Sequence, residues 1–283
     1  MITLPFRTMT WSIILTGLAI VDTIMLCAIA INKPFVIDMM GMDVLAISNA
    51  GCKTFHFVRR AAKMASSWLV VVICIERFFA ICYPLKVKKI CTRHNTIAAM
   101  VVIGSVAITF SGLSTENVGV RGSACLPSIA TNETRVQGKV MLLLGSSLSG
   151  VAPMLILITL TPIICWTLVR HRRARTVMTS SAKLADPYTR VSAMLVSVHM
   201  SYIILVLPMF VDINLKFMRP FSAAVYDEEI MEVFGKFSRI CEMINHSINF
   251  FLYVGFNSLF RRRLAQAFSR SVSVDRSNAD LMG

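Results

Sequence analysis

Charged side chains are scarce in this sequence. Only 16% of its 283 residues are charged, whereas 55% are hydrophobic and the mean hydropathy is +0.67. A typical soluble domain has about 25% charged residues, so the composition excludes an ordinary soluble protein and indicates a lipid bilayer. The sequence also lacks internal repeats, low-complexity tracts and any stretch that resembles a soluble domain. We therefore expect a single helical membrane domain.

Long apolar stretches are abundant by contrast. A membrane-spanning helix needs about 20 mostly apolar residues, and six stretches qualify: 10–31, 55–82, 95–113, 140–169, 191–213 and 231–254. The last contains four charged residues and is assigned partly from its context. The first is too long for the apolar core of a secretory signal peptide and carries Asp22 in its middle. The predicted fold is all-α, a polytopic membrane helix bundle.

The basic residues are unevenly distributed along the chain. The formal net charge is +14, and more than half of the 29 Lys and Arg residues lie at 7, 77–93, 170–190 and 261–276, on one side of the predicted membrane. Because basic loops remain in the cytoplasm, we expect both termini there. The basic tail is expected to contact anionic lipid headgroups, and no nucleic-acid partner is predicted.

The eight cysteines test this orientation. Five lie within the predicted spans, and Cys91 lies in a cytoplasmic loop, where thiols stay reduced. Only Cys52 and Cys125 fall on the extracellular side, so we predict a disulfide between them. The loop that holds Cys125 also carries the N-glycosylation acceptor at Asn132, in Asn132-Glu133-Thr134, which agrees with this orientation.

Polar residues within the predicted spans recur at helical spacing. In the second span they follow alternating steps of four and three, which places them on one helix face. From the outer end this stripe reads Arg59, Lys63, Ser66, Val70, Ile73 and Arg77. The last span has a similar face, made by Arg239, Glu242, Asn245, His246, Asn249 and Tyr253. Charge within a membrane is costly and usually functional, so we expect these faces to meet across a polar interior.

A purely structural explanation, in which a charged side chain reaches the membrane surface, fits some of these residues better than others. Arg59 and Lys63 lie near enough to the outer headgroups to snorkel towards them. For these two residues, the sequence leaves open whether the side chain faces the headgroups or the polar interior. Asp22, near mid-depth, has too short a side chain to reach water. Kinks are expected at Pro153, Pro162 and Pro208. Kinked spans around a polar interior fit a receptor, a transporter or a channel equally well.

Short motifs separate these classes. Glu76-Arg77-Phe78, followed by AICYPLK, resembles the Asp/Glu-Arg-Tyr motif of the rhodopsin-family (class A) G-protein-coupled receptors. LAIVD (18–22) resembles that family's Leu-Ala-x-x-Asp signature, and NFFLY (249–253) resembles its Asn-Pro-x-x-Tyr motif. FNSLFRRRL (256–264) is similar to its short amphipathic helix along the inner leaflet. Together these motifs extend over essentially the whole chain.

The details of the resemblance set further expectations. The positions of Cys52 and Cys125 fit the family's spacing. The segments NHSINFFLY and FRRRL are most similar to those of invertebrate FMRFamide-type neuropeptide receptors and molluscan chemosensory receptors. The family has seven spans and this chain has six. The first helix is therefore expected to be missing, as in a truncated isoform, a fragment or an incomplete gene model. The expected organisation is a receptor domain at 1–264 and a cytoplasmic tail at 265–283.

Several positions depart from the family's pattern. Phe250 replaces the motif's proline, and Val206 stands where an aromatic residue usually precedes the proline at 208. The third span of this chain lacks the usual tryptophan, and Thr161 stands where a tyrosine is common. These departures affect the expected activation contacts.

The resemblance implies roles for individual residues. The G-protein coupling and activation switch consists of Glu76, Arg77, Phe78, Asn249 and Tyr253. In the resting state Glu76 holds Arg77, and the loops at 83–94 and 170–190 complete the docking surface. An allosteric sodium ion, the one cofactor that the resemblance allows, is assigned to Asp22, Ser66, Asn245 and Asn249.

The implied function is a receptor that binds an extracellular ligand and activates a heterotrimeric G protein. Amine receptors carry an aspartate where Arg59 stands, so we expect a cationic cavity for a peptide or an acidic small molecule. Its residues are Arg59, Arg60, Lys63, Arg239 and Glu242, with Glu242 paired to Lys63 or Arg239 when the cavity is empty. Partners are this ligand, the G protein and the bilayer, and a receptor dimer is allowed.

Other classes remain as alternatives. A truncated form would be a non-signalling decoy or be retained in the endoplasmic reticulum instead of reaching the cell membrane. A six-span channel would need an arginine at every third position and a pore loop, and a transporter would often show two related halves. An intramembrane hydrolase would need a catalytic pair, for which Glu242 is a poor partner of Asp22. We therefore do not expect an enzyme.

Overall fold

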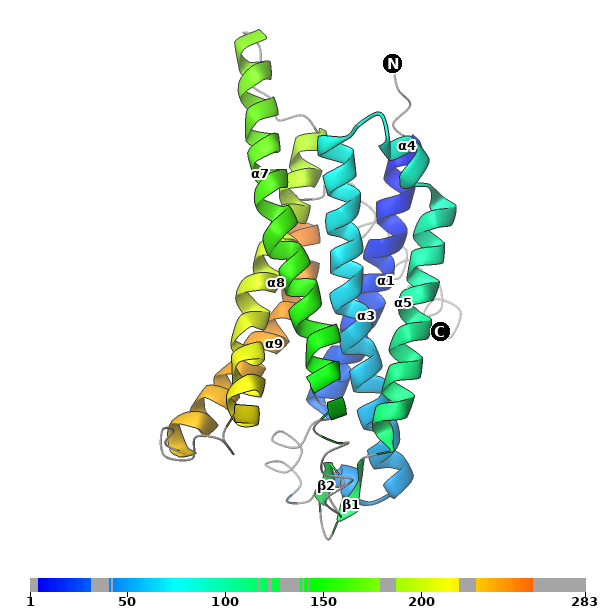
Figure 1. Ribbon diagram of the computed structural model, residues 1–283, viewed down its shortest axis with the longest axis vertical. Coiled ribbons are helices and arrows are strands. Elements are labelled where there is room, and N and C mark those ends of the chain that lie inside the picture. Colours follow the sequence, from blue (N-terminus) through cyan, green and yellow to red (C-terminus); the bar gives the residue numbers. More distant parts are fainter. Residues whose placement is uncertain are drawn as a thin grey trace, which may run out of the picture.

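Six long helices form a bundle in the computed structural model of the chain (Figure 1). The structure describes residues 5–31, 41, 43–116, 118–121, 124–127, 138, 140–141, 143–178, 187–218 and 228–256. The long helices are α1 (Pro5–Ala30), α3 (Asn49–Cys82), α5 (Arg93–Thr115), α7 (Ala152–Met178), α8 (Pro187–Met218) and α9 (Glu228–Phe256). They run alternately up and down, so that consecutive helices are antiparallel (Figure 1).

Helix α3 lies at the centre of the bundle, in contact with α1, α5, α7 and α8. Its first turn is capped by Ser48, whose hydroxyl accepts from the Gly51 N–H at 3.5 Å. It ends at Cys82, two residues before Pro84, because the residue before a proline avoids the helical conformation. A short helix, α4 (Val87–Ile90), then leads to α5, which is capped by Thr92. The polar stripe of α3 therefore lies along the axis of the whole bundle.

A small β-hairpin closes the end of the bundle opposite α4 (Figure 1). Strands β1 (Val118–Arg121) and β2 (Ala124–Pro127) pair antiparallel, and the predicted disulfide joins Cys52 to Cys125 with their Cα atoms 5.7 Å apart. Asp43, just before the short helix η1 (Val44–Ala46), accepts the Cys125 N–H at 3.2 Å. Asn49 accepts the Val120 N–H at 3.3 Å. The sequence analysis did not predict this hairpin, whose strands are only four residues each.

A turn of π-helix, η2 (Ser147–Val151), precedes α7 and interrupts the span expected at 140–169. Pro153 follows it and has no N–H, so the carbonyls four and five residues before it lack their helical donor. Both find donors on neighbouring helices. Trp68 of α3 donates its indole N–H to Leu148 O at 2.9 Å, and Tyr202 of α8 donates its hydroxyl to Ser149 O at 3.4 Å. The irregular backbone is thus tied to the core, as a membrane interior requires.

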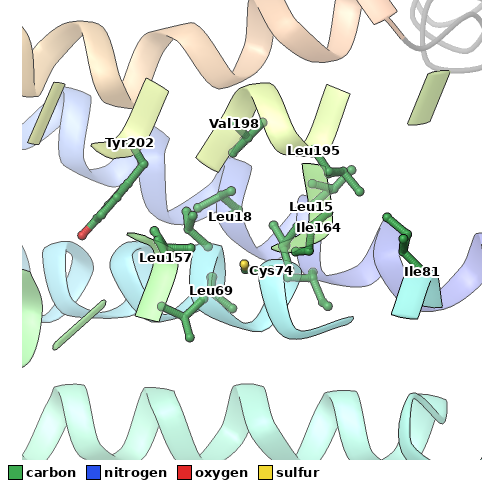
Figure 2. Packing of buried hydrophobic residues seen from close by; sticks show 14 residues of the cluster. Leu15, Leu18, Leu69, Cys74, Ile81, Leu157, Ile164, Leu195, Val198 and Tyr202 are labelled. Carbon is green, nitrogen blue, oxygen red and sulfur yellow. The ribbon is translucent and has the colours of Figure 1, made fainter. Parts of the chain in front are cut away.

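The main apolar core lies between α1, α3, α7 and α8 (Figure 2). Its fully buried side chains include Leu18, Ile73, Leu157, Leu195 and Val198. On α3 this apolar segment separates Ser66 from Arg77, eleven residues on, which corresponds to about 16 Å along a helix. The bundle therefore has an apolar layer between its middle and its α4 end.

The predicted all-α membrane bundle is confirmed. Among the described residues, five helical segments are long and apolar enough to span a membrane: Ile13–Ala30, Asn49–Cys82, Arg93–Thr115, Leu143–His171 and Leu195–Leu215. The sixth predicted span lies in α9, which is more polar but packs along α8 and α1. The amphipathic helix predicted at 256–264 lies almost wholly outside the described residues, as do Asn132 and the tail at 265–283. The proposed boundary between domain and tail stays a prediction.

The link between Trp68 and η2 gives a stability prediction. Replacing Trp68 with Phe removes the only donor described for Leu148 O, and an unsatisfied buried carbonyl costs about 1–3 kcal/mol. We expect the thermal melting temperature of purified W68F in detergent to fall measurably. Trp166→Phe is the matched control, because Trp166 is 66% exposed on α7. Equal melting temperatures for both variants would contradict this account of the turn.

Candidate functional site

A continuous polar column lies within the bundle, where the stripe of α3 faces α1 and α9. Its members from these three helices include Asp22, Ser66, Glu242, His246 and Asn249, each no more than 6% exposed. The column begins near the disulfide end and reaches the middle of the bundle. Two clusters make up the column, one around Glu242 and one around Asp22.

The outer cluster is an ion-pair network around Glu242. The carboxylate receives Lys63 Nζ at 2.6 Å and Arg59 Nη2 at 3.3 Å, both from α3. The Glu242 side chain is 5% exposed, compared with 20% for Arg59 and 24% for Lys63. Both basic residues therefore point into the bundle towards α9 and do not snorkel. Glu242 brings the two cations together and neutralises one of their charges.

Arg60 lies on another side of α3, at a cavity of about 150 Å³. Its Nη1 donates to the Ser114 carbonyl at 2.7 Å, and no carboxylate pairs with it among the described residues. Lys63, Phe110, Met141 and Ser149 also line this cavity. A partly buried guanidinium without a counter-charge can bind an anion from outside. The cavity has room for one end of a ligand.

Arg239 does not join the Glu242 network. It is half-buried on α9, and no described hydrogen bond or ion pair links it to Glu242 or to the stripe of α3. The prediction that Glu242 pairs with Lys63 or Arg239 is therefore fulfilled by Lys63. The structure adds Arg59, which sequence spacing had placed on the same helix face.

The second cluster surrounds the carboxylate of Asp22 on α1. Ser66 Oγ donates to Oδ1 at 2.8 Å, and Asn249 Nδ2 donates to Oδ2 at 2.9 Å. His246 Nδ1 lies 2.8 Å from Oδ1. Asn245 is buried nearby, but no described hydrogen bond joins it to Asp22. Three helices, α1, α3 and α9, therefore meet at one carboxylate.

The groups around Asp22 do not fit a sodium ion. A hard cation takes oxygen ligands, whereas the atoms that contact the Asp22 carboxylate are the ring nitrogen Nδ1 of His246, the amide nitrogen of Asn249 and the hydroxyl of Ser66. An N–H group donates to an anion and cannot ligate a cation. The predicted set of Asp22, Ser66, Asn245 and Asn249 omitted His246, although the sequence placed it on the same face of α9.

A small cavity connects the two clusters. Its volume is about 20 Å³, and Lys63, Tyr202, Glu242, Asn245 and His246 are among the residues that line it. This is room for about one water molecule. Lys63 and Glu242 of the outer cluster and His246 of the Asp22 cluster therefore line the same cavity, so a movement in one cluster can affect the other.

A third polar group lies beyond the apolar layer, at the α4 end. Glu76 Oε1 accepts a hydrogen bond from the hydroxyl of Thr96 on α5 at 3.1 Å. Glu76 and Arg77 are only 8% and 7% exposed. Phe78 packs edge-on against Phe79 and Tyr83, with ring centroids 5.6 and 5.7 Å apart. The anchor at Thr96 was not predicted.

His199 is a further residue that the sequence analysis missed. It is fully buried on α8, and neither ring nitrogen has a described hydrogen-bond partner. Buried polar groups without partners are exceptions that call for an explanation. The available signal was one histidine within the apolar run VSAMLVSVHMSYIILVL.

Some predicted site residues lie outside what the structure describes. The backbone of Tyr253 lies in the last turn of α9, but its side chain is not among the described ones. The second basic loop is described only up to 178 and again from 187. The roles assigned to these residues stay predictions.

Comparison with known proteins identifies the family. The sequence model of the 7 transmembrane receptor (rhodopsin family) matches residues 3–253. The chain belongs to this family. It is similar to Galanin receptor type 2 of Mus musculus, with 30% identity over 103 residues, 36% of this chain and 27% of that protein. Neurotensin receptor type 1 of Mus musculus is 28% identical over 141 residues, covering 46% of this chain and 32% of that protein.

A third relative is Growth hormone secretagogue receptor type 1 of Sus scrofa, which is 33% identical over 89 residues, 31% of this chain and 24% of that protein. The matched segments thus span about a quarter to a third of these relatives. As a rhodopsin-family receptor, the chain is a multi-pass membrane protein and not an enzyme. The narrower likeness to FMRFamide-type and molluscan receptors stays a prediction.

The Glu242 network makes a testable contribution to stability. Glu242→Gln leaves two partly buried cations without a carboxylate, and we expect the free energy of unfolding to fall by about 1–3 kcal/mol, the cost of groups that lose their hydrogen-bond partner. Glu232→Gln on the same helix is the control, because the Glu232–Lys236 pair is exposed and worth less than about 1 kcal/mol. Thermal melting of both purified variants measures the difference. Similar losses would show that the buried network is not a stabilising element.

Proposed function

We propose that the chain is a receptor that binds an extracellular, carboxylate-bearing ligand and activates a heterotrimeric G protein. The observation that carries this proposal is the polar column, which joins a cationic cavity at the disulfide end to Asp22 in the middle of the bundle. The apolar layer then separates the column from Glu76 and Arg77 at the α4 end. Membership of the rhodopsin family supports the assignment.

The orientation follows from redox chemistry and charge. Disulfides persist on the oxidising, extracellular side, which places the Cys52–Cys125 end outside. The opposite end carries Lys88 and Lys89 of α4 and Arg93 at the start of α5, as expected of a cytoplasmic face. The ligand cavity then opens towards the extracellular side, and Arg77 lies towards the G protein.

The ligand class follows from the charges around the cavity. Arg59 and Lys63 share Glu242, whereas Arg60 has no carboxylate partner among the described residues. A ligand carboxylate at Arg60 would gain a charge-assisted hydrogen bond in a partly desolvated position. The relatives are named as receptors for galanin and neurotensin, which supports a peptide ligand. We therefore propose a peptide, or a smaller acid, that presents a carboxylate to Arg60.

Signal transfer requires two arrangements of the same bundle. A ligand shifts their populations only if it binds the active arrangement more tightly than the resting one. In the structure the Thr96 hydroxyl donates to Glu76, next in the chain to Arg77, and we assign this contact to the resting arrangement. Helix α8 carries Pro208 and the unpartnered His199, so it is the element in which a rearrangement could supply new partners. A G-protein helix would bind where Arg77 becomes accessible.

The ligand proposal predicts a charge preference. Cells that express the chain are tested with a peptide library synthesised in pairs, with either a free C-terminal carboxylate or an amide. We expect activating peptides to require the free acid, and Arg60→Gln to weaken their potency at least 10-fold, since a charge-assisted hydrogen bond contributes about 1.5–3 kcal/mol. Lys236→Gln is the control, because this lysine is 63% exposed and pairs only with Glu232.

Two results would contradict the ligand proposal. One is activation by the amidated peptides with the same potency as the acids. The other is an equal response of Arg60→Gln and the Lys236→Gln control to every active peptide.

The Thr96 anchor predicts how basal signalling changes. Glu76→Gln and Thr96→Val each weaken the contact that holds Glu76, and losing a hydrogen bond of about 1–1.5 kcal/mol shifts a two-state equilibrium roughly 5- to 10-fold. We expect ligand-independent G-protein activation to rise in both variants. Thr159→Val is the control, because the Thr159 hydroxyl bonds only to carbonyls of its own helix. Unchanged basal activity in both variants would remove the anchor from the mechanism.

A further inference from the structure

We propose that His246 occupies the position at Asp22 that the family resemblance assigns to sodium, so that this receptor binds no sodium ion there. The inference rests on contacts of the Asp22 cluster and not on the proposed ligand. His246 Nδ1 lies 2.8 Å from Asp22 Oδ1, and both side chains are 5% exposed. The imidazole is therefore the direct partner of the carboxylate.

The donor chemistry excludes a shared site. A hydrogen bond of 2.8 Å from Nδ1 to an ionised carboxylate oxygen needs the hydrogen on Nδ1, which the imidazolium and the Nδ1–H tautomer of the neutral ring both carry. A nitrogen that carries a hydrogen has no lone pair for a metal. Ser66 donates to the same oxygen and Asn249 to the other. Oδ1 of Asp22 therefore has two described partners and Oδ2 has one, and the imidazole is the bulkiest of the three.

The surrounding packing keeps the imidazole in place. The neighbouring cavity holds only about 20 Å³, room for roughly one water molecule and too little for an imidazole ring. This cavity therefore offers no space into which the His246 ring could turn away from Asp22. A sodium ion and the ring cannot both occupy this space.

The consequence is a resting state that does not respond to salt at this site. In this receptor a side chain of α9 supplies the link between α1 and α9 that a mobile ion would otherwise provide. A smaller residue with an oxygen atom at 246 would leave both space and a ligand for a cation. The identity of residue 246 thus decides whether the site takes a metal.

The test uses sodium alone as the probe, on the purified full chain in detergent. Melting temperatures are compared in sodium chloride and in N-methylglucamine chloride at equal ionic strength, with potassium chloride as a second reference. We expect the wild-type chain to melt within about 1 °C in all three salts. His246→Ser should melt roughly 3 °C or more higher in sodium, because a ligand that binds only the folded state stabilises it. Adding Asp22→Asn to His246→Ser should abolish this shift.

One control variant and one substitute variant complete the test. Ser247→Ala, next in the chain, should behave like wild type, because its hydroxyl bonds only to Met243 O of its own helix. A sodium-dependent shift of the wild-type chain that Asp22→Asn abolishes would overturn the proposal, whether or not His246→Ser folds. A folded His246→Ser without a sodium response would also overturn it, and His246→Asn is the substitute if the serine variant does not fold. Because no ligand or G protein enters the measurement, its failure is distinct from failure of the proposed function.

Discussion

A carboxylate in the middle of a membrane needs hydrogen-bond donors from its own protein, and this constraint organises the bundle. Asp22 obtains them from Ser66 of α3 and from His246 and Asn249 of α9. Because an unsatisfied charge in a low-dielectric interior is very costly, the three helices must present these residues at the same depth. Glu242 repeats the arrangement one turn further out, where it holds Arg59 and Lys63. The polar faces of α3 and α9 are thereby kept in register.

The apolar layer explains how such a column can exist in a stable bundle. Between the Asp22 cluster and Arg77, the core is made mainly of buried aliphatic side chains such as Leu18, Leu157 and Leu195 (Figure 2), with His199 buried in the same region. Close-packed interiors move between discrete arrangements and do not deform continuously. A change at the outer end can therefore reach the Glu76 end only by a concerted movement of helices. The π-turn at η2, tied to Trp68 and Tyr202, anchors α7 to the two helices beside it.

Much of this arrangement could be predicted from residue patterns. The four–three spacing of the α3 stripe gave its inward face correctly, from Arg59 down to Arg77, because helix periodicity is a local property. The disulfide followed from topology and compartment. Sequence patterns did not predict the Thr96 anchor on Glu76, the failure of Arg239 to join Glu242, or the direct contact of His246 with Asp22. Each of these contacts depends on which residues of different helices lie at the same depth. The spacing of residues within one helix carries no information about that depth.

The sequence by itself determined the class of the molecule: apolar runs long enough for a bilayer, inward polar faces, and the motifs of the rhodopsin family. These depend on composition and on short-range periodicity, which are properties of the chain alone. The tertiary structure alone decided the partners. Helix rotation, depth and crossing place Glu242 on Lys63 and Arg59, leave Arg60 at the open cavity, and bring His246 to Asp22. The physical reason is that a buried charge takes whichever donor the packing brings within about 3 Å, and packing is a property of the whole bundle.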